Sequence, residues 1–159
     1  VETIADYIRT EARSAGLSEM DTLQFALNFV QGPNIEYRLD EECESIGFAK
    51  EYMRFPDEVL YDMEGDCDCK SSLASALFHA LGYDVIFLIS TKLKHAAVGV
   101  ECREDWLRNI SMPDPGAVLR EFNGKTYLFC ETTGEGNWMG HIKEGDSIMD
   151  FEEVVELRR

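Results

Sequence analysis

The sequence predicts an α+β fold in which helices come first and antiparallel strands follow. Hydrophobic residues recur at helical spacing up to about residue 81. Segments rich in β-branched residues take over from residue 84, and an Asn-Gly pair joins two apolar runs near residue 123. The length of 159 residues suits one domain, and the chain shows no internal repeat, low-complexity tract or linker. We therefore expect a single domain over residues 1–159.

Two helices are predicted in the N-terminal part of the chain. The first runs from Thr3 to Ala15 and ends at Gly16. Ser18, followed three residues later by Asp21, is typical of the N-cap of a second helix, which Gly32-Pro33 ends.

Residues 34–65 are predicted to be mostly loop. A short helix is expected within "RFPDEVLYDM", where Pro56 suits the first helical turn. The clearest helix of the chain follows, with Asp66 as its N-cap and Gly82 as the residue after its C-terminus. Its apolar stripe consists of Leu73, Ala76, Leu77, Ala80 and Leu81.

Strands are predicted in the second half. "DVIFLIS" (84–90) and "HAAVGVE" (95–101) have the length and composition of strands. "AVLREFNGKTYLFCE" predicts a hairpin around Asn123-Gly124, the preferred pair for a type I′ turn. "WMGHI" is expected to add a strand, and "DFEEVVELRR" is compatible with either a helix or a strand.

Charge and composition restrict the partners. The formal net charge of −16 repels phosphate backbones and anionic lipid, so we expect no nucleic-acid partner and favour a neutral or basic peptide or protein substrate. No apolar run is long enough to span a membrane. The first residue is Val, which suggests a domain taken from a larger protein. Five cysteines, an odd number, slightly favour a reducing cytoplasmic setting, with an extracytoplasmic domain as the alternative.

Two cysteines lie at the start of the predicted central helix. Cys67 and Cys69 point in nearly opposite directions, because a helix turns about 100° per residue. Cys69 lies on the apolar stripe and is expected to be a buried thiol. Cys67 lies at the helix N-terminus, where free backbone N–H groups favour a thiolate and can stabilise an oxyanion.

Four acidic residues surround Cys67 and work against a thiolate, so a nucleophilic role requires a cationic partner. They are Asp62, Glu64, Asp66 and Asp68. A zinc site is disfavoured because the Cys-x-Cys unit has no second ligand pair. The acidic cluster lacks the spacing of a known calcium loop, so we expect no cofactor, with calcium left open.

Three histidines could supply the cation. His79 lies within the predicted helix and is expected to be structural, and His141 suits either a rim or the core. His95 opens a predicted strand, where its imidazole can face the tip of a helix packed on the sheet and accept the proton of Cys67. Glu131, at the end of "KTYLFCE", is the candidate carboxylate to orient that imidazole if the two strands are neighbours.

Several phrases together resemble the transglutaminase-like (papain-like fold) cysteine peptidase superfamily, and especially its bacterial and archaeal transglutaminase-like branch. They are "FVQGPNIEY" (29–37), "FPDEVLYDMEGDC" (55–67), "GDCDCKSSLASALFHALGYDVIFL", "HAAVGV" and "YLFCETTG", so the resemblance covers about residues 23–142. It implies a nucleophile-bearing helix packed on an antiparallel sheet. It also implies that Cys67 is the nucleophile, His95 the base and Glu131 the acidic member of a triad.

The resemblance also has departures and weaker implications. Many relatives carry Asp where this chain has Glu131, and often an acid where it has Cys69. Gln31 resembles an upstream polar residue that lines an oxyanion site, although a glutamine at a helix end is usually solvated. Trp138 is either a wall of the cleft or a core residue.

The expected function is thiol-dependent acyl transfer on amide bonds, with hydrolysis as the main outcome. A cross-linking transglutaminase, in which an amine replaces water, stays open, as does a non-catalytic binding module. Activity should fall at low pH as the ion pair is lost, and at high pH as His95 deprotonates.

Overall fold

A computed structural model describes residues 1–44, 47, 50–109 and 115–157. Its helices are α1 (Glu2–Ala15), α2 (Glu19–Gln31), α3 (Pro56–Asp62), α4 (Cys67–Leu81), α5 (Glu104–Asn109) and α6 (Pro115–Val118), with 3-10 turns η1 (Asp40–Glu42) and η3 (Ile148–Asp150). Its strands are β1 (Glu36–Tyr37), β2 (Glu64–Gly65), β3 (Val85–Ser90), β4 (His95–Glu101), β5 (Leu119–Phe122), β6 (Lys125–Cys130) and β7 (Glu153–Leu157). The predicted α+β class is confirmed.

The predicted helix ends are confirmed by the capping contacts. Ser18 accepts a hydrogen bond from the backbone N–H of Asp21 at 3.2 Å and begins α2. Asp66 caps α4 by accepting from the backbone N–H of Cys69 at 3.5 Å. Gly82 ends α4 with a φ of 108°, a left-handed conformation that favours glycine.

The main sheet has the strand order β5-β6-β4-β3-β7, and all neighbouring strands are antiparallel. Asn123 and Gly124 join β5 to β6 with φ values of 49° and 79°, the two positive values that a type I′ turn requires. The C-terminal segment, which the sequence left open between helix and strand, forms the edge strand β7 beside β3.

Two strand predictions were wrong. "WMGHI" lies in the loop after β6, because its backbone donors go elsewhere: the N–H of Met139 bonds to the Gln24 side chain and the N–H of Gly140 to the carbonyl of Phe129. Ala117 and Val118, the first residues of the predicted hairpin, form the end of α6 instead of strand.

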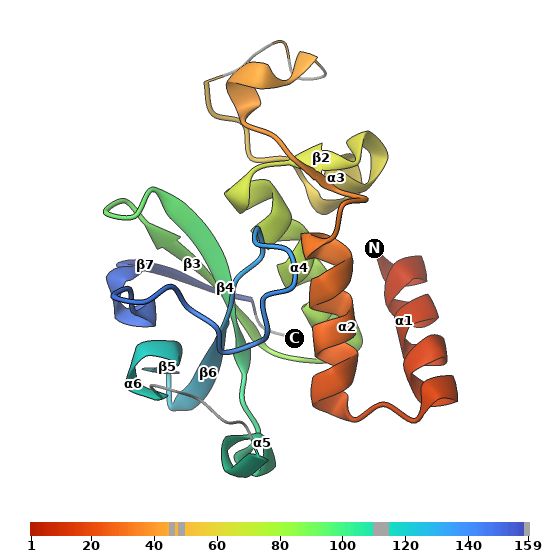
Figure 1. Cartoon of the computed structure of the whole chain (residues 1–159), viewed down its shortest axis with the longest axis vertical. Coiled ribbons are helices and arrows are strands. Elements are labelled where there is room, and N and C mark those ends of the chain that lie inside the picture. Colours follow the sequence, from red (N-terminus) through yellow and green to blue (C-terminus); the bar gives the residue numbers. More distant parts are fainter. Residues whose placement is uncertain (45–46, 48–49, 110–114, 158–159) are drawn as a thin grey trace.

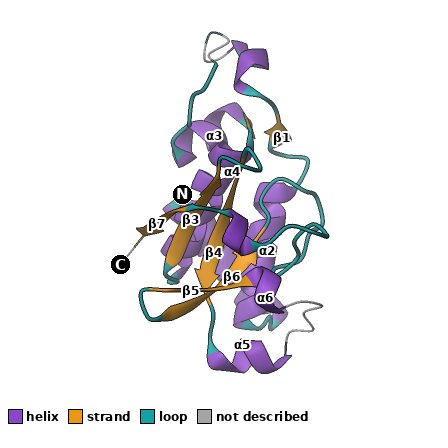
Figure 2. Cartoon of the chain, turned by 90° about the vertical axis from the view of Figure 1, so that its left-hand side faces the viewer, coloured by secondary structure: helices purple, strands orange, loops and turns teal. Residues whose placement is uncertain are grey.

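Helix α4 lies at the centre of the molecule (Figure 1). It packs against β3 and β4 on one side and against α1 and α2 on the other. Leu73, Leu77 and Phe78 are fully buried in these contacts. In Figure 2, α3 lies above the main sheet and α5 lies below it. None of the helices in the described ranges combines the length and apolar character needed to cross a bilayer.

Candidate active site

The start of α4 presents Cys67 as its first residue, with the side chain half-buried. Gly65, two residues before Cys67, lies so close to the first turn of α4 that a side chain would not fit there. A Cβ on Gly65 would lie 2.6 Å from the Cβ of Cys69, closer than real contacts allow. The Gly-Asp-Cys sequence therefore combines a residue without a side chain, a helix cap and the thiol at the helix tip.

A short parallel pairing brings Tyr37 alongside this helix start. Tyr37 of β1 pairs with Gly65 of β2, and the N–H of Arg38 donates to the carbonyl of Gly65 at 3.3 Å. Burial and the negative charges of Cys67 and Glu131 raise the pKa of Tyr37 to about 12. The phenol therefore stays protonated and remains a hydrogen-bond donor beside the thiol. No local signal in the sequence predicts this two-residue pairing, so Tyr37 could not be placed beside Cys67 from the sequence.

His95 and Glu131 lie in direct contact. His95 is the first residue of β4, and Glu131 directly follows β6, the neighbouring strand. Nε2 of His95 lies 2.9 Å and 3.1 Å from the two carboxylate oxygens of Glu131. The side chains are 23% and 19% exposed, so the pair is accessible to solvent while largely shielded. The expectation that these two strands are neighbours is confirmed, because β4 pairs directly with β6.

The electrostatics of this pair favour its charged form. Burial lowers the pKa of His95, but interactions with Cys67 and with Glu131 outweigh burial and raise it to about 10. Burial likewise raises the pKa of Glu131, but His95 and the N–H and hydroxyl of Thr133 outweigh it and lower that pKa to about 2. Since Nε2 is occupied by Glu131, Nδ1 is the nitrogen left to face Cys67.

Two further carboxylates flank the thiol. Burial first, and then a hydrogen bond with Asp66, raise the pKa of Asp68. Oδ1 of Asp68 is buried without a hydrogen-bond partner among the described residues. The expected acidic surroundings of Cys67 are therefore present.

Gln31 does not take the position expected of an oxyanion donor. Its Nε2 donates to the backbone carbonyls of Glu131 at 2.7 Å and Asn137 at 3.0 Å, so both amide hydrogens are committed. Gln31 is only 3% exposed, whereas a glutamine at a helix end is usually solvated. The oxygen left over, Oε1, is buried and is an acceptor, which cannot stabilise an oxyanion.

Trp138 is 66% exposed, so the core alternative is wrong. It lines a shallow recess of about 380 Å³ with Asn28, Gly32 and Glu135. Among the other histidines, His79 is half-buried on α4 and His141 is exposed, which settles the choice between rim and core for His141.

All five cysteines are free. Cys69 is buried as predicted, and burial raises its pKa to about 12. Cys43 and Cys130 are also buried. Cys67 and Cys102 alone among the five are partly accessible, and burial raises the pKa of Cys102 to about 11.

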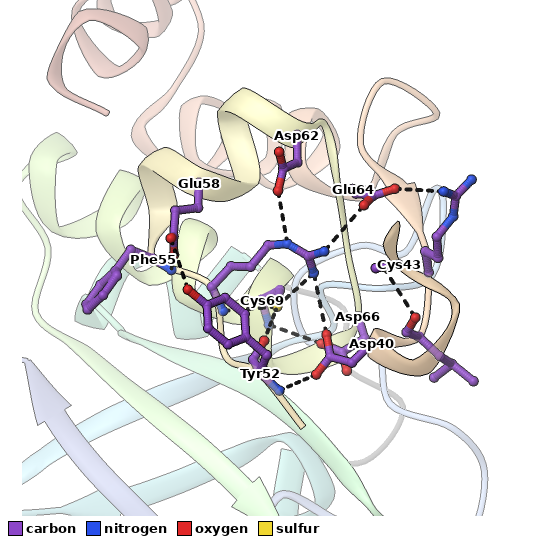
Figure 3. Close-up of polar contacts among 12 residues, drawn as sticks. Asp40, Cys43, Tyr52, Phe55, Glu58, Asp62, Glu64, Asp66 and Cys69 are labelled. Atoms are coloured by element: carbon purple, nitrogen blue, oxygen red, sulfur yellow. Dashed lines mark hydrogen bonds and ion pairs between the residues drawn. The ribbon is translucent and has the colours of Figure 1, made fainter. Parts of the chain in front are cut away.

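A buried arginine organises the segment that leads into α4 (Figure 3). Arg54, whose side chain is fully buried, forms ion pairs with Asp40 at 3.5 Å, Asp62 at 3.3 Å and Glu64 at 3.3 Å. Its backbone N–H donates to the sulfur of Cys69 at 3.3 Å. These contacts join η1, the end of α3 and β2 to the first turn of the helix that carries Cys67.

The same place contains a group that resembles a metal site. Ligand atoms of Asp40, Asp66 and Cys69 all lie within 4.8 Å of one another. However, the guanidinium of Arg54 lies 3.5 Å from Asp40 and 3.9 Å from the Cys69 sulfur, and it already supplies positive charge there. The cluster is therefore an arginine–carboxylate network, and its geometry gives no reason to add a metal.

Comparison with models of known protein families found no match, and a search of curated proteins found no similar sequence. The resemblance drawn from the sequence therefore stays a prediction.

Proposed function

We propose that this protein catalyses thiol-dependent acyl transfer on amide bonds, as a transglutaminase-like cysteine peptidase or amidase of papain-like fold. Cys67 would act as nucleophile, His95 as general acid and base, and Glu131 as the group that orients the imidazole. The observation that carries the proposal is the contact between His95 and Glu131, in which the carboxylate holds Nε2 of the ring at 2.9 Å. The raised pKa of His95, to which Cys67 and Glu131 both contribute, supports the pairing of the imidazole with this thiol.

The reaction follows from these contacts. The Cys67 thiolate attacks the amide carbonyl carbon, and the carbonyl π electrons move to oxygen to form an oxyanion. Collapse of this intermediate breaks the C–N bond, and the imidazolium of His95 gives its proton to the departing amine. Neutral His95 then takes a proton from water as its oxygen attacks the thioester, and breaking of the C–S bond releases the carboxylic acid and restores the Cys67 thiolate beside the imidazolium.

Backbone donors at the tip of α4 support the oxyanion. Asp66 accepts from the N–H of Cys69. The N–H groups of Cys67 and Asp68 also belong to the first helical turn, whose donors have no partner within the helix. These groups also carry the positive end of the helix dipole. Removing one oxyanion donor typically costs about 10²–10³ in kcat, so this contribution is large.

Hydrolysis is the favoured outcome because the site is open to water. Cys67 is half-buried, and the His95 and Glu131 side chains each retain about a fifth of their exposure. A transferase must keep water from the thioester, and the described residues place no cover over it. Incorporation of an amine into a glutamine peptide is thus the outcome that would favour cross-linking over hydrolysis.

The chain contains its own control for a test of nucleophile activation. Iodoacetamide at about pH 6 should modify Cys67 rapidly, whereas Cys102, also partly accessible, should react slowly because its pKa is raised. Mass spectrometry after tryptic digestion assigns the two rates. Equal, slow reaction at both cysteines would instead support a non-catalytic binding module.

Turnover is tested with a peptide library. Wild type should cleave amide bonds, Cys67→Ala should lose this activity, and Cys102→Ala should retain it. Equal turnover by Cys67→Ala and wild type would refute the proposed chemistry.

A further inference from the structure

Two buried glutamines on α2 face the loop that begins with Glu131. Gln24 and Gln31 lie seven residues apart and therefore on the same side of the helix. They are 6% and 3% exposed, unusual for a residue type that is mostly found at the surface. The apolar periodicity of α2 does not explain why two glutamines are buried against this loop, so their contacts must be considered individually.

The two glutamines hold different ends of the loop. Gln24 donates to the carbonyl of Asn137 at 3.1 Å and accepts from the N–H of Met139 at 2.8 Å. Gln31 also reaches Asn137, at 3.0 Å, but in addition donates to the carbonyl of Glu131 at 2.7 Å. Only Gln31 of this pair contacts the residue that holds His95.

We propose that Gln31 is a positioning residue, which fixes the backbone of Glu131 so that the carboxylate meets Nε2 of His95 with both oxygens. The inference deepens the proposed function and rests on its triad. The orientation of the amide is dictated by its partners, because a flipped amide would place Oε1 against two carbonyl oxygens.

The distances show why the backbone of Glu131 must be held. The carboxylate accepts from His95 at 2.9 Å and 3.1 Å, and the longer of these distances is already close to the upper limit of the normal range. A backbone displacement of about 1 Å would carry the carboxylate beyond hydrogen-bonding distance. On the α4 side, the hydroxyls of Ser71 and Thr132 hydrogen-bond to each other at 2.8 Å, and they hold the residue next to Glu131.

The unsatisfied oxygen of Gln31 supports a positioning role. Oε1 is buried without a hydrogen-bond donor among the described residues. A buried polar atom without a partner lowers the stability of the folded state. An apolar side chain would avoid that cost but could not donate to Glu131, so stability alone does not explain an amide at this position.

The test compares Gln31→Met with Gln24→Met. Each variant replaces one amide with an apolar side chain of similar length and removes the hydrogen bonds of that amide to the same loop. Titration of His95 is followed by the NMR signal of its Cε1–H, and Cys67 alkylation is measured on the same samples. We expect wild type and Gln24→Met to share a high His95 pKa, near 10, and Gln31→Met to show a pKa lower by about 1–3 units and slower alkylation.

A role in stability alone would lower the free energy of unfolding in both variants and leave the His95 titration unchanged. Gln31→Asn, which keeps the amide but shortens it by one methylene, provides the same test if Gln31→Met does not fold. The proposal is overturned if the His95 titration of the folded Gln31 variant matches wild type, or if Gln24→Met lowers it equally. An ordinary His95 pKa in wild type would overturn the triad as well, which separates the failure of the proposed function from that of this inference.

Discussion

Three donors converge on the carboxylate of Glu131. The single Nε2–H of His95 is shared between both oxygens, and the N–H and hydroxyl of Thr133 donate to Oε1 at 2.9 Å and 2.7 Å. Donors of this kind stabilise the charged form of a carboxylate and so offset the cost of burying it. Thr133 also holds the Glu131 side chain in the position from which it reaches the imidazole.

The pH dependence of stability should report this ion pair. The pKa of Glu131 is lowered from 4.5 to about 2, so its contribution is present above pH 4.5 and is lost as the pH falls toward 2. The pKa of His95 is raised from 6.5 to about 10, so its contribution is complete below pH 6.5 and is lost as the pH rises through 10. Urea unfolding of wild type and Glu131→Gln should therefore differ most between pH 4.5 and 6.5.

Glu135→Gln is the matched control, since Glu135 is an exposed carboxylate in the same loop. Its difference from wild type should stay small at every pH. A difference between wild type and Glu131→Gln that does not change with pH would mean that the pair is not ionised in the folded protein.

Arg54 connects the irregular segment before α4 to the first turn of that helix. Its partners come from η1, α3 and β2, and Asp40 is only 2% exposed. Breaking a buried ion pair by removing one partner leaves the other charge uncompensated in a place that water cannot reach. The first turn of α4, and with it Cys67, depends on this cluster for its surroundings.

Arg54→Met should therefore destabilise the protein strongly, by about 3–5 kcal/mol in the free energy of unfolding. Arg38→Met is the control, because Arg38 binds the same Glu64 at 2.9 Å from a side chain that is 36% exposed. Exposed ion pairs contribute little, so this variant should unfold close to wild type. Urea unfolding at neutral pH measures both. Similar stabilities of the two variants would show that the Arg54 cluster is not essential to the fold.

Helices and hairpins could be predicted where the residues that specify them lie close together in the sequence. The cap, the apolar stripe and the terminating glycine of α4 lie within one helix length, and the turn pair of the β5–β6 hairpin lies between its strands. Contacts between distant segments were not predictable in the same way. Gln31 meets a carbonyl 100 residues later, and a helix-end glutamine gives no sign in the sequence that it is buried.

The candidate site shows the same division. Cys67 followed from helix-end chemistry, and His95 and Glu131 followed from strand ends together with a family resemblance. Arg54 was not predicted, because its role depends on three acids that the fold gathers from separate elements. The strand predicted in the loop after β6 does not form, because the backbone N–H of Met139 bonds to the side chain of Gln24. Gln24 lies 115 residues earlier in the chain, so no local pattern could reveal this contact.

For the molecule as a whole, negative charge dominates. The chain has 31 acidic and 15 basic side chains, so at least half of the acids have no basic partner of their own. Most of the observed ion pairs involve partly exposed side chains, which contribute little, whereas unscreened repulsion acts across the entire surface. The balance predicts that repulsion is the larger of the two electrostatic effects on stability.

Salt should therefore stabilise this protein at neutral pH. Raising NaCl from about 0.01 M to about 0.15 M shortens the screening length from about 30 Å to about 8 Å, which suppresses repulsion between distant acids. The Arg54 cluster is buried and is screened much less. A gain of about 1 kcal/mol would raise Tm by about 2–4 °C for a domain of this size, as measured by calorimetry. Near the isoelectric pH of 4.4 the net charge vanishes, and the same addition of salt should leave Tm unchanged or lower it. A fall in Tm with salt at neutral pH would show instead that attractive pairs outweigh the repulsion.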